Sequence, residues 1–362
     1  MPSEQTKLSF ANRPVPVIPY YPYWRGRIYA MLGLLILLAV VVVLATAIGS
    51  VDIPFLATAR IMIDKLPLVD ITPSWTSAWE TIILEIRLPR VILAGVVGAA
   101  LAIAGATYQG LFRNPLADPY LIGVAQGAAL GAVIGFLVPI TGIGIGSVPL
   151  FAFVGALVSV AVVYSLARVG GTLPVTTLIL AGVALGALLG AIVSYLVITS
   201  GAKMPGIIFW LIGSFSLSQW SEVQVVLPIM VVGVVVIMLF ARSLNIMQLD
   251  EEQAQQLGIN VERLKLILLT AATLMTAAAV SFVGIIGFIG IIIPHAVRLI
   301  WGPDYRFLLP LSVLSGAIFL ILADVVARTI LAPSEIPIGV ITAICGAPFF
   351  LYLLRRRTKM LF

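Results

Sequence analysis

The sequence predicts an all-α polytopic membrane protein with about ten transmembrane helices. Its mean hydropathy is +1.16 over 362 residues, and only 10% of these residues are charged. Uncharged runs of about 20 residues recur along the chain, which is the length that an α-helix needs to cross a bilayer. The runs are apolar on every face, whereas the strands of a membrane β-barrel alternate in polarity. The spans are therefore helices.

The uncharged runs give the helices in order. They are 28–51, 91–112, 119–167, 169–202, 204–221, 223–241, 266–297, 307–323 and 336–354. The run 119–167 is long enough for two helices, with a break near Pro139 and the following "TGIGIG". The run 266–297 holds one full span and one short span, separated by "VGIIGFIG", whereas glycines and serines break 204–221 into less than a full span. The expected total is ten.

One membrane domain, 28–356, is expected between a cytoplasmic leader, 1–27, and a short cytoplasmic tail, 357–362. The first apolar run is too long for the core of a cleavable signal, so we expect a retained first helix. With the N-terminus inside, most of the 21 basic residues fall on the cytoplasmic side, as the positive-inside rule requires. The net charge of +6 is then a topology signal and gives no reason to expect a nucleic-acid partner. In this topology 52–86 is a long outer loop and 243–262 is a cytoplasmic loop.

Residues that carry chemistry are scarce. The single cysteine, Cys345, and the single histidine, His295, cannot form a disulfide or a metal site of the usual ligand types. His295 follows a proline and is expected to pack at a helix end. No P-loop motif is present, and Asp324 in the ninth span is the exception among spans whose interiors lack acids. These features disfavour a self-powered pump, an ion-coupled carrier and a membrane enzyme.

The most polar segment is "SLNIMQLDEEQAQQLGINVERLK", which begins at Ser243. Asp250, Glu251 and Glu252 favour a helix N-terminus because their charges interact favourably with the helix dipole. Gly258 suits the cap at the other end of such a helix. A short cytoplasmic helix is therefore expected, either as a solvated connector or as a contact for another protein.

Glycines recur every four residues in two of the predicted helices. "GAALGAVIG" places Gly127, Gly131 and Gly135 on one helix face, and "GVALGALLG" does the same for Gly182, Gly186 and Gly190. Small residues at this spacing let helix backbones approach closely in lipid. We expect packing within one subunit, with a dimer interface or a pore wall as the alternatives.

Several stretches in consistent order resemble one family of transport proteins. They are "IRLPRVILAGVVGAALAIAGATYQGLFRNPLADPYLIGV" from Ile86, "LAGVALG" from Leu180, "GFIGIIIPHAVRL" from Gly287, "LLPLSVLSGAIFLILADVVAR" from Leu308 and "EIPIGVITAICGAPFFLYLL" from Glu335. Together they resemble the FecCD-type permease subunits of binding-protein-dependent ABC importers for iron chelates, haem and cobalamin. The resemblance runs from about Ile86 to the C-terminus.

The resemblance implies a type II ABC importer fold, similar to that of the cobalamin importer permease, in the cytoplasmic (inner) membrane. It implies a homodimer with the pathway on its two-fold axis, two cytoplasmic ABC ATPase subunits and an extracytoplasmic substrate-binding protein. The chain itself would be no enzyme and would hold no cofactor, since ATP and Mg bind to the ATPase partners. The expected cargo is an iron-siderophore or haem. Cobalamin import is the alternative within the family, and an ion-coupled secondary carrier is the alternative from another class.

The resemblance also implies site residues at the cytoplasmic side. The residues expected to couple the chain to the ATPase are Asp250, Glu251, Glu252, Ala254, Leu257 and Gly258. Among them, Ala254 is expected to leave room for close docking. The residues expected to form a cytoplasmic gate are Asn114, Leu116, Val175 and Thr176, and the Asn-Pro pair favours a turn in its own right.

On the outer side, the resemblance implies that Arg87, Arg90 and Arg328 dock the binding protein. Arg87 and Arg90 are three residues apart and are expected near one face of a helical turn. The alternatives are headgroup contact or, for Arg328, a pair with Asp324. The residues expected along the pathway or in helix packing are Gly182, Gly186, Gly190, Phe209 and Trp210, the last two in a partial outer helix or as interfacial aromatics. No residue is expected to bind a metal ion.

Overall fold

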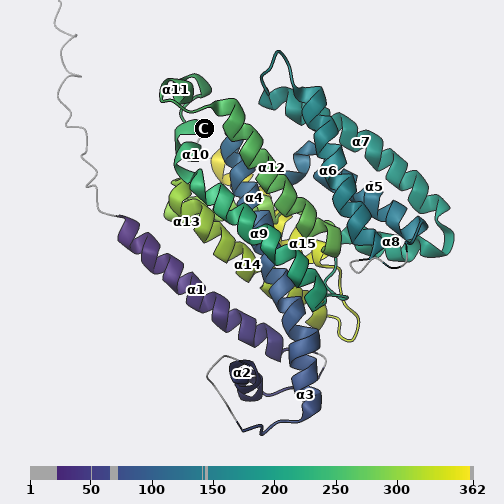
Figure 1. The fold of residues 1–362 in the computed structure, drawn as a ribbon. Coiled ribbons are helices and arrows are strands. Elements are labelled where there is room, and N and C mark those ends of the chain that lie inside the picture. Colours follow the sequence, from purple (N-terminus) through teal and green to yellow (C-terminus); the bar gives the residue numbers. More distant parts are fainter. Residues whose placement is uncertain (1–22, 50, 66–71, 141, 143–145, 359–362) are drawn as a thin grey trace, which may run out of the picture.

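The computed structural model describes residues 23–49, 51–65, 72–140, 142 and 146–358 as a bundle of helices, with no β-strand in these ranges (Figure 1). Most of the expected leader, 1–27, and the end of the expected tail, 357–362, lie outside the described residues.

Within the described residues, ten helices account for the ten expected spans. Seven are long and apolar enough to cross a membrane: α1 (Tyr23–Ala47), α4 (Leu88–Leu111), α6 (Ser147–Ala167), α7 (Val175–Thr199), α9 (Trp220–Leu239), α12 (Val261–Val283) and α14 (Tyr305–Thr329). Two are shorter apolar helices, α5 (Val124–Leu137) and α13 (Ile289–Trp301), and the third is α15 (Ile338–Thr358), whose apolar part is the shorter stretch Ile338–Tyr352. The expected partial helix is α8 (Met204–Ile212). The prediction of an all-α polytopic membrane protein is thus confirmed.

Short elements join these spans. They are α2 (Phe55–Asp64), α3 (Ser77–Thr81), the π-helical turn Ile82–Arg87, α10 (Ala241–Met247), α11 (Glu251–Gln256) and the 3₁₀ turns Pro119–Ile122 and Gly201–Lys203.

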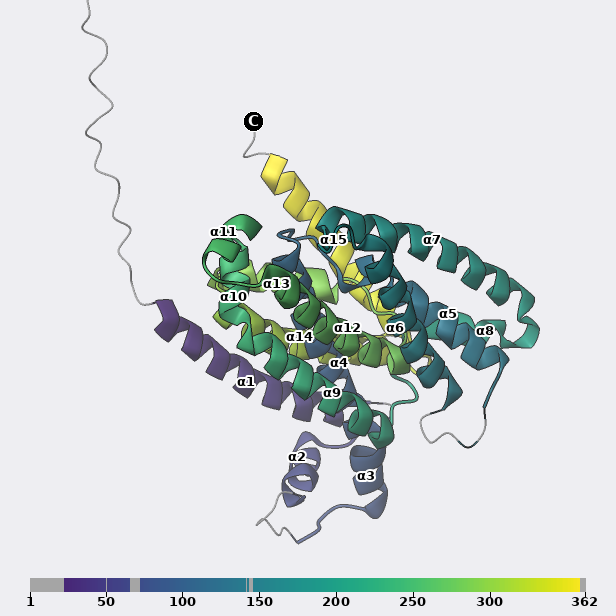
Figure 2. The same ribbon diagram turned by 45° about the horizontal axis from the view of Figure 1, so that its top comes forward.

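The centre of the bundle is α4, which is buried along almost its whole length. It packs against α9, α12, α13 and α14, while α1 lies along the edge of this group against α14. Helices α5, α6 and α7 form a second group, which meets the first through α6 and α12 (Figures 1 and 2). Consequently α1 and α7 expose most of their apolar surface, with only 11% of the most apolar stretch of each buried.

Glycines allow the closest helix crossings. A Cβ atom on Gly98 would overlap the carbonyl group of Gly316 in α14, and one on Gly105 would overlap the carbonyl group of Gly290 in α13. The backbones can therefore come together only because these side chains are absent.

The two glycine stripes expected from the sequence differ in their surroundings. Gly127, Gly131 and Gly135 all face the backbone of α6, so this first stripe packs within one chain. Gly182 approaches the carbonyl oxygen of Leu121 just as closely. Gly186 and Gly190 have only ordinary contacts, with a Cβ at 3.7 and 3.6 Å from Gln126. Only the first residue of the second stripe is tightly packed inside the chain.

Replacing Gly131 by valine will disrupt the packing of α5 on α6, because the added carbons fall on the backbone of Phe151. We expect the apparent melting temperature of the purified protein in detergent to fall by at least about 5 °C. Gly186→Ala is the matched control, since a Cβ there meets no atom closer than 3.7 Å. Equal melting temperatures for the two variants would contradict the packing described above.

The segment expected as an outer loop, 52–86, is largely helical. From Ser77 the chain runs through α3 and the π-helical turn into α4, so that Ser77–Leu111 is one helical segment of 35 residues. Two contacts hold this segment: Lys65 Nζ lies 2.8 Å from Glu80, and Arg87 donates to carbonyl groups near the end of α1. The expectation of a loop is wrong from Ser77 onward, because Thr76 caps α3 and the helix then continues without a break into α4. Residues 66–71 lie outside the described residues.

Candidate functional site

Polar clusters lie at the two opposite ends of the bundle. We call these the α11 end, which carries α10 and α11, and the α3 end, which carries α2 and α3 (Figure 1). The predicted coupling and gate residues lie at the α11 end, and the three predicted docking arginines lie at the α3 end.

At the α11 end, α4 is followed by a tight turn at 112–118. Asn114 Oδ1 accepts a hydrogen bond of 2.9 Å from the backbone N–H of Leu116, and the N–H of Asn114 donates to the Gln109 carbonyl at 3.2 Å. The following proline disfavours helical geometry at Asn114. The expected turn is therefore present, and it leaves Leu116 55% exposed.

The polar segment forms α11, as its sequence predicts. Asp250 caps the helix, because its Oδ1 accepts a hydrogen bond of 2.7 Å from the Glu251 N–H, and Arg113 Nη1 lies 2.9 Å from the same oxygen. These two hydrogen bonds hold the pKa of Asp250 below its usual range. Gly258 follows the helix with a φ of +85°, a conformation that glycine adopts without strain.

The burial of side chains on α11 differs from the expectation. Ala254 is fully buried inside the chain, because α11 turns this face toward α10 and α12. The expectation that Ala254 leaves room for a partner is therefore wrong. Leu257 and Leu249 are 62% and 59% exposed, so the apolar side chains available to another protein flank the helix. Glu252 is also exposed.

Lys265, near the start of α12, connects α11 to the segment before α7. Its side chain is only 4% exposed, and its Nζ lies 2.8 Å from Glu251 and 3.4 Å from Glu262. Lys265 Nζ also donates to the Leu173 carbonyl at 3.2 Å, and Glu262 Oε2 accepts from the Leu173 N–H at 3.0 Å. Both backbone groups of Leu173 are thus held by α12, and the same lysine is held by α11.

The ion pairs of α11 therefore reach both segments that were expected to form a gate. Arg113 belongs to the turn that carries Asn114 and Leu116, and Leu173 lies just before Val175 and Thr176. Val175 is partly buried and Thr176 is exposed. Sequence reasoning missed Arg113 and Lys265 as links, although an acid three residues before Lys265 was a visible signal.

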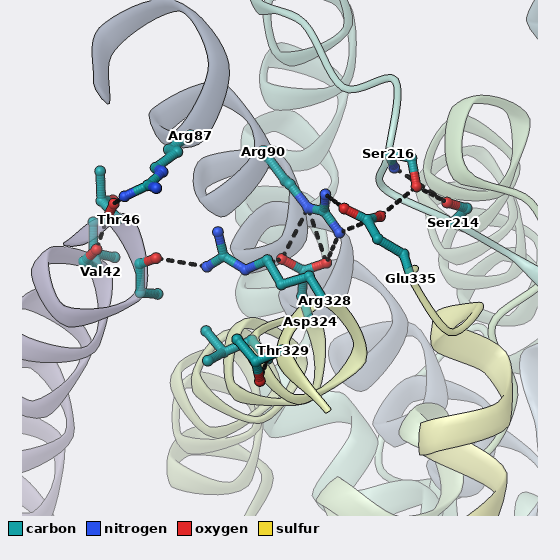
Figure 3. Close-up of polar contacts among 12 residues, drawn as sticks. Val42, Thr46, Arg87, Arg90, Ser214, Ser216, Asp324, Arg328, Thr329 and Glu335 are labelled. Carbon is teal, nitrogen blue, oxygen red and sulfur yellow. Dashed lines mark hydrogen bonds and ion pairs between the residues drawn. The ribbon is translucent and has the colours of Figure 1, made fainter. Parts of the chain in front are cut away.

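At the α3 end, Arg90 is held by two carboxylates from different elements (Figure 3). Its Nε lies 3.1 Å from both oxygens of Asp324, and its Nη2 lies 2.8 Å from Asp324 Oδ1. Its Nη1 and Nη2 lie 2.8 and 3.1 Å from the two oxygens of Glu335. Asp324 is in α14, whereas Glu335 is in the segment between α14 and α15. This arrangement joins three parts of the chain.

The other two predicted docking arginines, Arg87 and Arg328, bind backbone carbonyl groups near the end of α1. Arg87 is 5% exposed and donates to the carbonyls of Thr46 and Ala47 at 3.3 and 2.6 Å. The Arg328 side chain is 6% exposed; its Nε lies 3.5 Å from Asp324 Oδ2, and its Nη2 donates to the Ala45 carbonyl. The alternative of a local Arg328–Asp324 pair is therefore present.

The expectation that Arg87 and Arg90 lie near one face is wrong. Arg87 points toward α1 and Arg90 toward α14 and Glu335, because the π-helical turn before α4 changes the angle between them (Figure 3). Sequence reasoning also missed Glu335, which is 245 residues from Arg90 along the chain. Burial would raise the pKa of Glu335, but hydrogen bonds from Arg90 and Ser216 hold it below its usual range.

Helices α8 and α15 share an apolar surface that no other described helix covers. An open pocket of about 660 Å³ lies there, lined by Ile212, Gly339, Val340, Ala343, Ile344, Ala347 and Pro348. Ile344 is 63% exposed, and the single cysteine, Cys345, is exposed beside it. On α8, Phe209 is 40% exposed, whereas Trp210 packs against the main core. Exposed apolar surface of this kind is typical of a lipid or protein contact.

His295 packs against aromatic rings of α15. Its ring centre lies 6.2 Å from that of Phe349 and 6.5 Å from that of Phe350. Within the part of the chain that the structure describes, no three His, Cys, Asp or Glu side chains lie close enough together to hold a metal ion.

Comparisons with known proteins agree with this architecture. The model of the FecCD transport family matches residues 37–356. The chain is 44% identical to the cobalamin import system permease protein BtuC of Halobacterium salinarum, over 77% of this chain and 74% of that protein. It is 40% identical to the hemin transport system permease protein HmuU of Yersinia pestis, over 91% of this chain and 96% of that protein.

A solved structure is also similar. It is an inward-facing conformation of a transporter of the metal-chelate ABC type, with a TM-score of 0.79 and 30% sequence identity. The match covers 93% of this chain and all of the other chain.

Proposed function

Because the chain belongs to the FecCD transport family, we propose that two copies of it form the membrane pathway of an ABC importer for a metal chelate. In this proposal the ATPase subunits are separate proteins, and the chain itself is a passive pathway. A soluble binding protein delivers the chelate. The α11 end is cytoplasmic and the α3 end faces outward.

The observation that carries the proposal is the set of ion pairs around α11. A partner that moves α11 would pull on Arg113 through Asp250 and on the Leu173 segment through Glu251 and Lys265. Exposed Leu249 and Leu257 give such a partner apolar anchors on both sides of the helix. We therefore assign α11 as the contact for an ATPase subunit, with the exposed Leu249, Glu252 and Leu257 as its contacting side chains.

The segments that α11 reaches are proposed to be the cytoplasmic gate. Leu116 and Thr176 are exposed at this end, and Asn114 fixes the turn that presents Leu116. In a two-fold dimer these side chains would face their copies across the axis. Movement of α11 would then open both gate segments together.

The exposed surfaces of α7, α8 and α15 are proposed to face the second copy and the pathway. These surfaces are apolar, and each lies away from the core formed around α4. Phe209 and the pocket between α8 and α15 lie along this surface. Gly186 and Gly190 leave room near Gln126, so that helices lining the pathway can move relative to each other.

The proposed cargo is an iron-siderophore or haem, with cobalamin as the alternative. The similar proteins named above transport hemin in one case and cobalamin in the other. In each of these compounds the metal is already held by its chelator. A pathway for them therefore needs sufficient width and an uncharged wall, and it does not need metal ligands.

An ion-coupled carrier remains the alternative from another class. Such carriers place ionisable groups along the ion path. The buried Arg87, Lys265 and Asp324 instead lie near helix ends, and each is bonded to groups of this chain. This arrangement favours the ATP-driven pathway.

Uptake by proteoliposomes tests the proposal. The complete importer, with its ATPase subunits inside and its binding protein outside, should accumulate a ferric siderophore, haem or cobalamin only when ATP is enclosed. Ionophores that remove proton and sodium gradients should leave uptake unchanged. Uptake that needs a gradient and no ATP would establish the ion-coupled carrier instead.

A further inference from the structure

The guanidinium group of Arg90 presents two hydrogen-bonding edges. Each edge binds a different carboxylate, and the two carboxylates differ in how exposed they are. Asp324 takes the edge formed by Nε and Nη2, and its side chain is 2% exposed. Glu335 takes the edge formed by Nη1 and Nη2, and its side chain is 31% exposed (Figure 3). The buried edge of Arg90 is therefore fixed by the fold, whereas the more accessible edge is held by a loop residue.

The charges of the cluster come close to balance. The guanidinium groups of Arg87, Arg90 and Arg328 lie near the carboxylates of Asp324 and Glu335, and Asp52 adds a third negative charge near Arg87. Of the two carboxylates that contact Arg90, Glu335 is the more accessible, at 31% exposure of its side chain. A carboxylate from outside that takes the place of Glu335 on Arg90 restores the charge-assisted hydrogen bonds of that arginine. Such a carboxylate can bind the accessible edge of Arg90 only if Glu335 leaves it.

Glu335 also accepts a hydrogen bond from the segment after α8, next to the surface between α8 and α15. Its Oε2 accepts a hydrogen bond of 2.6 Å from Ser216 Oγ, and Ser216 Oγ lies 2.8 Å from Ser214 Oγ (Figure 3). In the same region the N–H of Ile338, at the start of α15, donates to the Gly213 carbonyl at 3.0 Å. Glu335 thus connects Arg90 with the segment after α8 and with the beginning of α15.

We propose that Glu335 is an exchangeable internal ligand of Arg90, which a carboxylate of the docking binding protein displaces. Asp324 stays in place and keeps Arg90 oriented toward the incoming group. The displaced Glu335 no longer ties Arg90 to Ser216, so the segment after α8 and the start of α15, which stay bonded to each other, become free to move together away from α4. Docking and opening of the pathway are thereby linked through one residue. This inference rests on the proposed function, in which a binding protein docks at the α3 end.

The test compares Glu335→Gln with the wild type in the complete importer, reconstituted in lipid nanodiscs. The probe is the chelate-loaded binding protein of the same importer, and its dissociation constant is measured at low salt. An amide competes poorly with a carboxylate for Arg90, and the substitution adds one positive charge to the cluster. We therefore expect the binding protein to bind about fivefold more tightly, or better. If Glu335 only stabilises the fold, the affinity for the binding protein will be unchanged or lower, and the inference is then wrong.

Glu80→Gln is the matched control, because it removes one negative charge at the same end from an exposed pair with Lys65. We expect less than about a twofold change in affinity, since exposed pairs are screened by solvent and salt. Should Glu335→Gln fail to fold, Glu335→Asp keeps the charge but shortens the reach to Arg90, and a smaller gain in affinity is expected. An unchanged or weaker affinity in that variant would equally overturn the inference.

A second readout separates the exchange from simple electrostatic attraction. With Glu335 released from Arg90, ATP hydrolysis in the absence of the binding protein should rise at least about twofold in Glu335→Gln. Glu80→Gln should leave this basal rate unchanged. If the affinity rises but the basal rate does not, the proposed link to the pathway is wrong. If the wild-type importer binds no binding protein at the α3 end, the proposed docking fails and this inference fails with it.

Discussion

Replacing Lys265 by methionine will uncouple ATP hydrolysis from transport. Methionine fills a similar volume but removes the charge that holds Glu251 of α11 and the Leu173 carbonyl before α7. Breaking a buried ion pair costs about 3–5 kcal/mol at the site, so the connection between α11 and the Leu173 segment is lost. We expect chelate uptake to fall at least about tenfold, while the ATPase subunits remain bound and hydrolyse ATP.

The measurement is the ratio of chelate imported to ATP hydrolysed, in proteoliposomes that contain the complete importer. Arg263→Gln is the matched control, because Arg263 is an exposed basic residue two positions earlier in α12. Its ratio should equal that of the wild type. A Lys265→Met variant that inserts correctly and keeps the wild-type ratio would contradict the transmission through Lys265.

Replacing Asp324 by asparagine will strongly destabilise the protein. Asp324 is 1% exposed and lies within hydrogen-bonding or ion-pairing distance of both Arg90 and Arg328. Without its charge the two guanidinium groups repel each other in a poorly solvated site. Removal of one partner from a buried ion pair typically costs about 3–5 kcal/mol. We expect a large fall in the melting temperature of the purified protein, by at least about 5 °C.

The double variant Asp324→Asn, Arg328→Gln should recover part of this stability, because it also removes the charge of Arg328, whose ion-pair partner is Asp324, while Arg90 keeps its contact with Glu335. Glu80→Gln, in the exposed pair with Lys65, serves as the control and should melt close to the wild type. A melting temperature for Asp324→Asn equal to that of Glu80→Gln would show that the cluster does not stabilise this end of the bundle.

The sequence was sufficient for the number and order of the spans, because an uncharged run of about 20 residues has few alternatives to a membrane helix. It was misleading about where helices start, because charged residues inside the helices have partners that the uncharged runs do not reveal. The helical segment that contains α4 begins at Ser77, after the cap of Thr76, and it carries Glu80 and Arg87, which bind Lys65 and the end of α1. Similarly, α12 begins at Val261, after the cap of Asn260, and it carries Lys265, which Glu251 and Glu262 enclose.

The site was predictable only in part, for a similar reason. The turn at Asn114 and the caps of α11 follow from local chemistry, so Asn114, Asp250 and Gly258 behave as their sequence predicts. The direction of a side chain on a helix as short as α11 depends instead on packing against other helices. For this reason Ala254 was assigned to the wrong face. The partnership of Arg90 with Glu335 spans 245 residues and left no local signal.

The central claim is that two copies of the chain enclose the pathway, with α15 facing the second copy. The single exposed cysteine, Cys345 on α15, allows a test without any introduced residue. A short bis-maleimide applied to membranes that contain the complete importer should join two copies through Cys345. It should also stop ATP-driven chelate uptake, and Cys345→Ala should abolish both effects. If Cys345 reacts with single maleimides but no reagent joins two copies, and uptake continues after modification, α15 does not line a shared pathway.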